Sequence, residues 1–325
     1  MKPLIGLLAS LLIAVIQPAA AADNYPSRPI RMVIPWGAGG GNDIIGRFLA
    51  EKLAVAMGQS VIVDNRAGQS GVIGADFVSR AAPDGYTIMV HSVTSNDSNG
   101  SVYPNLPYDT RKSFAPVALI ASSPHVIVTH PSFPANNLRE LVNYVKAHPN
   151  QVSYASFGTG SSSHLTAVLL GDQLGLQMVH VPYKSSAPAM TDTIGGHVPI
   201  YFPTVAAAIE YIKAGKLRGI AVTGATRSKQ LPNLPTVDEA MGTTGFVGEA
   251  MYGVYAPAGT PPEIVARLNR EFEKILALPE TGDKLLALGT NGPIKSTPEQ
   301  MGAYIDEDFN KWARVVKSAN IKPND

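Results

Sequence analysis

The chain of 325 residues contains no cysteine, so it has neither a disulfide framework nor a thiol nucleophile. It also lacks an excess of charge of either sign, because 26 Lys and Arg residues stand against 25 Asp and Glu residues. This balance gives no electrostatic attraction to nucleic acid or to an anionic membrane, and no basic run with interleaved aromatic residues is present. We therefore expect no nucleic-acid partner.

Motifs for metal binding and hydrolysis are missing as well. The seven histidines form no H-x-x-x-H or H-E-x-x-H pattern, so no metal site is indicated. Neither Ser70 nor Ser161 lies in a G-x-S-x-G turn, the usual position of a hydrolase nucleophile. We therefore expect no catalytic residues, no bound metal and no cofactor.

The N-terminus carries an apolar run of the kind found in exported proteins. Lys2 precedes the apolar residues 4–16, and Pro18 and four alanines follow them. A charged start, a short apolar segment and small residues are typical of a secretory signal peptide, and the run is too short for a permanent membrane span. We expect residues 1–22 to be a signal peptide and the protein to be periplasmic.

The most informative stretch lies just beyond, at residues 30–57. Residues 30–34 form an apolar strand pattern, and the loop 35–43 contains four glycines in the five positions 37–41. An amphipathic helix pattern follows, with Asn42 or Asp43 as its expected cap and Gly58 as its end. Such a loop directs free backbone N–H groups and the helix dipole at one point, which favours anion binding.

The same design recurs about 120 residues later. A strand pattern at 152–157 leads into the polar loop 158–164, and a helix pattern then ends at Gly175. Two such units suggest two lobes that hold one small anion from both sides. Because neither loop contains Lys or Arg, the anion would be held by N–H dipoles and hydroxyl groups.

The intervening and following segments indicate the general architecture. Alternating strands and helices between residues 60 and 90 favour a parallel sheet, whose ligands lie beyond the carboxyl ends of the strands. Residues 91–95 should therefore face the cleft, whereas 96–112 read as irregular. The chain should cross between lobes near 122–124, and Thr260 should cap a C-terminal helix.

One alternative stays open at this point. Gly37-x-Gly39 begins a dinucleotide fingerprint, although Asn42 occupies the place of its third glycine. Asp64 lies at a plausible distance for binding a ribose. The alternative function is thus a cofactor-dependent or hydrolytic α/β enzyme.

Many ordered motifs resemble the Bug family, the periplasmic receptors of tripartite tricarboxylate transporters. They are YPSRPI at 25–30, GGGND at 39–43, VDNR at 63–66, PDGYT at 83–87, LPYD at 106–109, GTGS at 158–161 with His164-Leu165, HVPYK at 180–184, GKLR at 215–218, LPTV at 234–237 and APAGTP at 256–261. The resemblance runs from about Tyr25 to the C-terminus.

The resemblance implies a two-lobed α/β Venus flytrap of the type II-like periplasmic binding fold, with two crossovers. The first lobe would comprise 24–122 and 250–325, and the second 123–249. It also implies a monomer that binds a small organic carboxylate or dicarboxylate, which could be aromatic, and delivers it to a membrane permease. A receptor that reports to a signalling partner is a variant of this function.

Departures from the usual family residues occur at Trp36, Ala38, Asn42 and Ser185, so the identity of the ligand does not carry over. Tyr183 and Tyr252 are further aromatic candidates for the ligand site. The complete set of expected ligand-binding residues is Trp36, Ala38, Gly39, Gly40, Gly41, Asn42, Ser92, Thr94, Gly158, Thr159, Gly160, Ser161, Ser162, His164, Tyr183 and Ser185.

Overall fold

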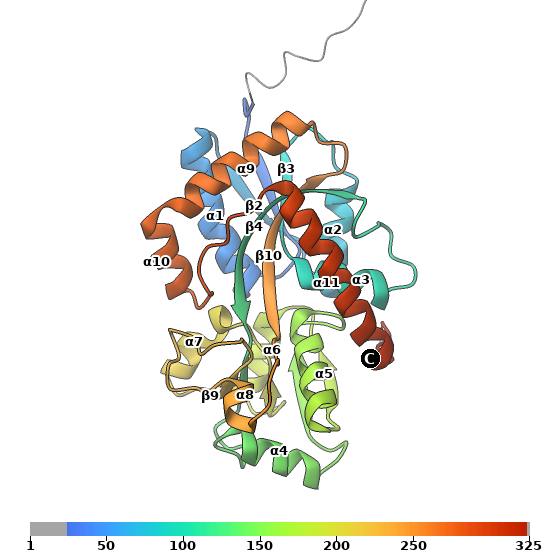
Figure 1. Cartoon of the computed structure of the whole chain (residues 1–325), viewed down its shortest axis with the longest axis vertical. Helices are drawn as coiled ribbons and strands as arrows, with labels where there is room; N and C mark the ends of the chain where they lie inside the picture. Colours follow the sequence, from blue (N-terminus) through green and yellow to red (C-terminus); the bar gives the residue numbers. More distant parts are fainter. Residues whose placement is uncertain (1–24, 324–325) are drawn as a thin grey trace, which may run out of the picture.

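The computed structural model describes residues 25–323, which form two lobes, each built around a five-stranded sheet (Figure 1). The first sheet has the order β2-β1-β3-β10-β4. Its strands are β1 (Ile30–Ile34), β2 (Val61–Asn65), β3 (Thr87–Ser92), β4 (Phe114–Pro124) and β10 (Glu249–Pro257). The expected parallel pairing holds for β1 with β2 and β3, whereas β10 pairs antiparallel with both β3 and β4.

The second sheet has the order β7-β6-β8-β5-β9. Its strands are β5 (Val126–Thr129), β6 (Ser153–Ser156), β7 (Val179–Pro182), β8 (Ile200–Tyr201) and β9 (Arg218–Val222). Strand β6 pairs parallel with β7 and β8, and β5 pairs antiparallel with β8 and β9. Both sheets are therefore parallel on one side and antiparallel on the other. The two strand–loop–helix units predicted from the sequence lie in the parallel half of each sheet.

Helices cover both faces of the first sheet because its strands alternate their apolar side chains between the faces. Met32 and Ile88 pack with α1 (Gly41–Met57), α9 (Pro262–Ala277) and α10 (Pro279–Ala287). Val33 and Met89 face the opposite layer, which contains α2 (Val72–Ser79) and α11 (Pro298–Ser318). The short 3-10 helix η1 (Gln69–Gly71) leads into α2, and α3 (Val93–Val102) follows β3.

The second sheet is covered in the same way. One core contains α4 (Leu138–Ala147), α5 (Ser162–Leu174) and α8 (Val237–Met241). The other contains α6 (Ser186–Ile194) and α7 (Val205–Lys213), and it includes Ile34 and Trp36 from the first lobe. The end of β1 and the loop after it are thus packed into the second lobe, so the lobes are closed against each other.

The chain passes between the sheets twice, from β4 to β5 and from β9 to β10 (Figure 1). The two connections lie side by side, because His125 N–H donates to Gly248 O and Thr223 N–H donates to His125 O. Hydrogen bonds between the connections fix their relative position where the lobes meet.

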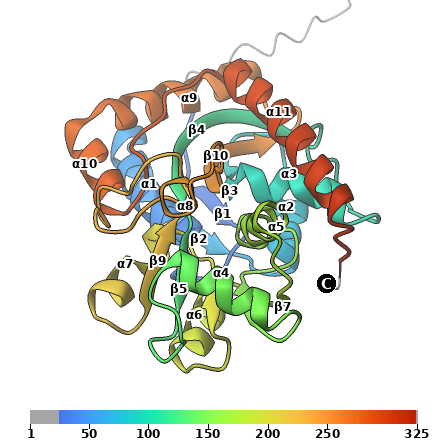
Figure 2. The same ribbon diagram turned by 60° about the horizontal axis from the view of Figure 1, so that its bottom comes forward.

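The final helix contacts both lobes. It packs along α3 of the first lobe, and Figure 2 shows it running across that lobe toward α5. Trp312 and Val316 form a small buried cluster with Leu165 of α5 and Val102 of α3. None of the helices in the described range 25–323 is long and apolar enough to cross a membrane. The expected signal peptide, residues 1–22, lies outside the described residues.

Three local predictions were wrong. The N-cap of α1 is Gly40 rather than Asn42 or Asp43, because the helix starts earlier than its apolar periodicity suggests. The segment 96–112 is not irregular throughout, since α3 extends to Val102 with a polar yet buried composition that carries no apolar period. Thr260 does not cap α9, because its hydroxyl donates to the Pro257 carbonyl and Pro261 is the N-cap.

Candidate functional site

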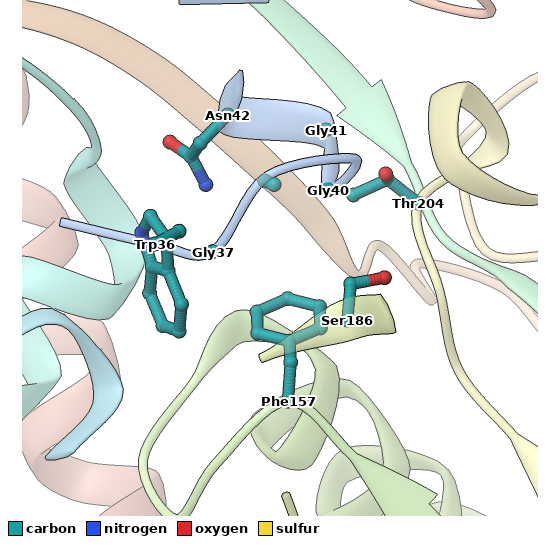
Figure 3. Close-up of a pocket in the computed structure, with 9 residues that line it drawn as sticks. Trp36, Gly37, Gly40, Gly41, Asn42, Phe157, Ser186 and Thr204 are labelled. Carbon is teal, nitrogen blue, oxygen red and sulfur yellow. The ribbon is translucent and has the colours of Figure 1, made fainter. Parts of the chain in front are cut away.

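A narrow cavity lies where the two lobes meet, at the end of the first glycine-rich loop (Figure 3). The first lobe contributes residues of the loop after β1, the first turn of α1 and Ala250 of β10. The second lobe contributes Phe157 after β6, Ser186 at the start of α6 and Thr204 before α7. The complete lining consists of Trp36, Gly37, Gly40, Gly41, Asn42, Phe157, Ser186, Thr204 and Ala250.

The N-terminus of α1 has no side-chain cap, because its N-cap residue is Gly40. Within the described part of the chain, the N–H groups of Gly40, Gly41 and Asn42 donate to no protein acceptor. The N–H of Gly39 is used differently, since it donates to Asp43 Oδ2 at 2.9 Å. The first turn of α1 therefore offers donors and a positive dipole end to the cavity.

Asp43 stabilises the loop by hydrogen bonds, and its negative charge does not repel an anion in the cavity. Its Oδ1 accepts from Asn65 Nδ2 at 2.9 Å, and Arg47 Nε lies 2.9 Å from Oδ1 and 3.1 Å from Oδ2. Burial raises the pKa of Asp43, but the hydrogen bonds from Arg47, Gly39 and Asn65 outweigh it and keep the pKa below its usual value. Its negative charge is thus neutralised locally by Arg47.

Two further helix N-termini reach the same end of the cavity from the second lobe. Ser185 and Thr204 are the N-caps of α6 and α7, and neither side chain makes a capping hydrogen bond. A Cβ atom added to Gly41 would lie 2.6 Å from Thr204 Oγ1, and one added to Gly40 would lie 3.4 Å from Ser186 Cβ. Glycine is required at position 41, where the starts of α1 and α7 converge most closely, whereas a Cβ at position 40 would make an ordinary contact with α6.

Buried polar atoms without a protein partner also meet at this point. Thr204 Oγ1 and Tyr252 Oη lie close enough to interact with each other, but neither has a well-aligned hydrogen-bond partner among the described residues; Asn42 Oδ1, on the side of Trp36, has none either. Thr204 is 4% exposed, Asn42 6% and Tyr252 0%. Both hydroxyl groups lie against Gly41. Buried polar groups are normally paired, so these atoms mark a place where a ligand or water molecule can bind.

The other side of the cavity is aromatic. Trp36 and Phe157 come from different lobes and meet edge to face, with their ring centroids 5.2 Å apart. Trp36 Nε1 donates to His91 Nδ1 at 3.3 Å, so the donor of the indole is already used. Burial lowers the pKa of His91 to about 3, and the ring is neutral at physiological pH.

The second loop does not line the cavity; it docks onto the first lobe. The Thr159 carbonyl accepts from Ser70 Oγ at 2.6 Å and from Tyr103 Oη at 3.2 Å, and the Gly160 carbonyl accepts from Ser98 Oγ. Ser162 N–H donates to Ser95 Oγ at 3.0 Å. We call this set of hydrogen bonds, made by Ser70, Ser95, Ser98 and Tyr103 to residues 159–162, the interlobe latch.

The helix that follows this loop is capped from within. Ser161 Oγ accepts from His164 N–H, and His164 Nδ1 accepts from Gly160 N–H at 3.1 Å. Burial lowers the pKa of His164 well below its usual value, and the neighbouring His180, stacked at 3.9 Å, lowers it further. An uncharged His164 is consistent with an Nδ1 that accepts a hydrogen bond.

The expected site residues thus separate into groups. Trp36, Gly40, Gly41 and Asn42 line the cavity, whereas Ala38 and Gly39 are exposed beside it. Ser185 touches the loop, since a Cβ on Gly37 would lie 2.8 Å from Ser185 Oγ. The remaining expected residues are buried but do not line the cavity. Ser92 is the N-cap of α3 and Thr94 lies in its first turn. The others belong to the second unit: Gly158, Thr159, Gly160, Ser161, Ser162 and His164.

Tyr183 and Tyr252 behave differently from the expectation that their rings grip a ligand. Tyr183 Oη donates to Asp192 Oδ2 at 2.7 Å and the residue is absent from the lining. Tyr252 presents its hydroxyl group rather than its ring. The sequence reasoning missed Gly37, Phe157, Ser186, Thr204 and Ala250. The run Thr-Val-Ala-Ala-Ala at 204–208, which follows an apolar strand pattern, was the one signal that could have indicated the start of α7.

Solved structures place this architecture among two-lobed periplasmic binding proteins. The periplasmic binding protein BugD has 36% sequence identity and a TM-score of 0.86, covering 92% of this chain and 100% of its own. Rpa4515 of R. palustris, solved with adipate, has 33% identity and a TM-score of 0.88, covering 91% and 99%. The class of protein is therefore a solute-binding receptor and not an enzyme.

The sequence comparisons define the family. The profile of the tripartite tricarboxylate transporter family receptor matches residues 45–321. Protein BugT of Bordetella pertussis is 36% identical over 303 residues, which cover 93% of this chain and 92% of BugT. The chain belongs to the tripartite tricarboxylate transporter receptor family.

Proposed function

We propose that this receptor binds an organic carboxylate between its lobes, with the carboxylate group at the joint N-termini of α1, α6 and α7. The observation that carries the proposal is the convergence of three helix starts without side-chain caps on one end of the cavity. An anion there receives backbone hydrogen bonds and the ends of three helix dipoles. Thr204 supplies a further hydroxyl group, and Trp36 and Phe157 contact the body of the ligand, which we propose to be aromatic or otherwise apolar.

The neighbouring structure solved with adipate supports a carboxylate ligand. Family membership supports delivery to a permease of the tripartite tricarboxylate type. We further propose that the protein acts as a monomer exported by its signal peptide, with lobes formed by 24–122 plus 250–325 and by 123–249. On this division the cavity lies between the lobes. Its volume of about 10 Å³ in this arrangement holds about one water molecule, so a ligand binds to a more open arrangement and then favours closure around itself.

Asn42→Asp tests the position of the carboxylate. The substitution keeps the size of the side chain but places a negative charge in the first turn of α1. Affinity for a carboxylate ligand should fall at least tenfold, about 1.4 kcal/mol, in titration calorimetry. Asn320→Asp, exposed beyond the end of α11, adds the same charge far from the cavity and should leave the affinity unchanged.

The ligand itself can be identified from protein purified from its native host. Native mass spectrometry should reveal a retained small carboxylate, whereas a retained dinucleotide or sugar would contradict the proposed ligand class. Equal affinity of wild type and Asn42→Asp would place the carboxylate away from α1.

A further inference from the structure

The polar and apolar groups of the cavity are separated to opposite sides. Figure 3 shows Ser186 and Thr204 on the side of Gly40 and Gly41, with Trp36 across the cavity from them and Phe157 between. None of the nine lining residues carries a charge at neutral pH. The donors for a carboxylate are therefore concentrated at one end.

The aromatic side of the cavity has few hydrogen-bond donors that could bind a second carboxylate group of a ligand. The only N–H of the Trp36 side chain donates to His91, and Phe157 has no donor. Behind these rings lie His91 and His125, and burial lowers their pKa values to about 3 and about 4, so both are neutral. His125 stacks on Phe157 with 6.2 Å between ring centroids. The remaining donors on this side are neutral: the side-chain amide of Asn42 and the backbone N–H of Gly37.

We propose, building on the proposed carboxylate site, that the natural ligand is a monocarboxylate with an apolar or aromatic body. A dicarboxylate would leave its second charge against Trp36 and Phe157, with no cation and only the neutral donors of Asn42 and Gly37 for its two oxygen atoms. Burying a charge with so few partners is strongly unfavourable. A neutral polar substituent, by contrast, finds both a donor and an acceptor in Asn42.

Matched ligand pairs test this inference. Hexanoate and adipate have the same number of carbon atoms and differ in one carboxylate group. Benzoate and terephthalate share one ring and also differ in one carboxylate group. In titration calorimetry near pH 7.5, the monocarboxylate of each pair should bind at least ten times more tightly than its dicarboxylate partner. Adipate or terephthalate binding as tightly as its monocarboxylate would overturn the inference and leave the carboxylate receptor intact.

Benzamide separates this inference from the proposed function beneath it. It has nearly the shape of benzoate but carries no charge, so it should bind at least tenfold more weakly. Benzamide that binds as well as benzoate would overturn the carboxylate site itself.

A variant reverses the preference. Phe157→Arg places a cation on the aromatic side and should increase the affinity for terephthalate relative to benzoate at least tenfold. Phe157→Gln is the uncharged control, and thermal unfolding of both variants shows whether they fold. A folded Phe157→Arg protein with an unchanged preference would also count against the inference.

Discussion

The two strand–loop–helix units of this receptor have similar sequence patterns but use their helix N-termini differently. In the first unit, Gly40 leaves the start of α1 without a side-chain cap, and its N–H groups face the cavity. In the second, Ser161 caps α5, and Ser162 N–H donates to Ser95 of the opposite lobe. The first helix start is open to a ligand, whereas the second is satisfied by the protein.

The difference depends on which group occupies the N-cap and on what the loop touches. A glycine N-cap supplies no competing oxygen, so the N–H groups of the first turn stay available. A serine N-cap uses one of them, and the latch uses the carbonyls of Thr159 and Gly160. Both loops send one N–H to the side chain four residues on: Gly39 to Asp43, and Gly160 to His164. Glycine-rich loops before helices are thus not equivalent as anion sites.

Gly41→Ala should have the largest effect, because it alters the open unit at its narrowest point. The added Cβ would lie 2.5 Å from Tyr252 Oη and 2.6 Å from Thr204 Oγ1, so the lobes could not close as they do here. Affinity should fall about 100-fold, or 2.7 kcal/mol, in titration calorimetry.

Gly39→Asn is the matched control for this effect. Gly39 has a φ of +82° and no neighbour within 4 Å, and asparagine tolerates this backbone region. Its affinity should stay within a few fold of wild type. Similar losses in both variants would indicate that any change in the loop disturbs binding, and that closure at Gly41 is not the cause.

The two units should also respond differently to acid. The pKa of His164 is lowered well below its usual value of about 6.5 by burial, so the unfolded state binds more protons as the pH falls below 6.5. The stability contributed by neutral His164 is complete above that pH and is lost as the pH decreases, at about 1.4 kcal/mol per unit. Asp43, with its pKa lowered from a usual value near 4, keeps its contribution at pH 5.

Urea unfolding of wild type and His164→Gln at pH 7.5 and 5 measures this difference. Relative to the variant, wild type should lose stability below pH 6.5, at up to about 1.4 kcal/mol per pH unit. Contributions of His91 and His125 are common to both proteins and cancel. Parallel pH profiles would show that His164 is not held neutral in the folded second unit.

The latch can be weakened without touching the cavity. Ser98→Ala removes the hydroxyl that donates to the Gly160 carbonyl across the lobes, and a net hydrogen bond contributes about 1 kcal/mol. The closed state should become less favourable, with affinity about fivefold lower and a larger radius of gyration in small-angle scattering without ligand. Ser79→Ala removes a local bond to Asp76 within α2 and should change neither quantity. An unaltered Ser98→Ala protein would mean that the latch does not hold the lobes together.

Much of this arrangement follows from the sequence. The strands around both loops and the helix endings at Gly58 and Gly175 agree with local rules that act within a few residues. The cavity itself was only half predictable. Thr204 and Ser186 reach Gly41 and Gly40 from a distant part of the chain, and nothing in local patterning specifies that approach.

The function of the second loop was hidden for the same reason. Its glycines and hydroxyl groups predict an anion site as readily as those of the first loop do. Only the approach of Ser70, Ser95 and Ser98 from the other lobe satisfies these groups. Helix α3 carries two of these serines and lacks an apolar period, because it is buried among polar partners.

The smallest expected effect concerns the two tryptophans, which report on both sides of the contact between the lobes. Helix periodicity and the family resemblance suggest that Trp312 belongs to the first lobe alone and would be silent during ligand binding. The structure instead packs Trp312 against Leu165 of α5, and its Nε1 donates to Asp308 Oδ1 at 3.0 Å. Opening of the lobes would therefore change the surroundings of both indoles. Trp36 should still dominate, because it lines the cavity and meets Phe157.

Fluorescence of the single-tryptophan variants separates the two contributions. Trp312→Phe should keep most of the ligand-induced change, and Trp36→Phe should keep a smaller but measurable part. The remaining change in Trp36→Phe should shrink further when Ser98→Ala is added, because the latch and the Trp312 cluster both join α3 to the second unit. If instead Trp312→Phe abolishes the fluorescence change, the ligand binds near the second unit. The proposed contrast between an α1 N-terminus open to ligand and an α5 N-terminus occupied by protein groups would then be wrong.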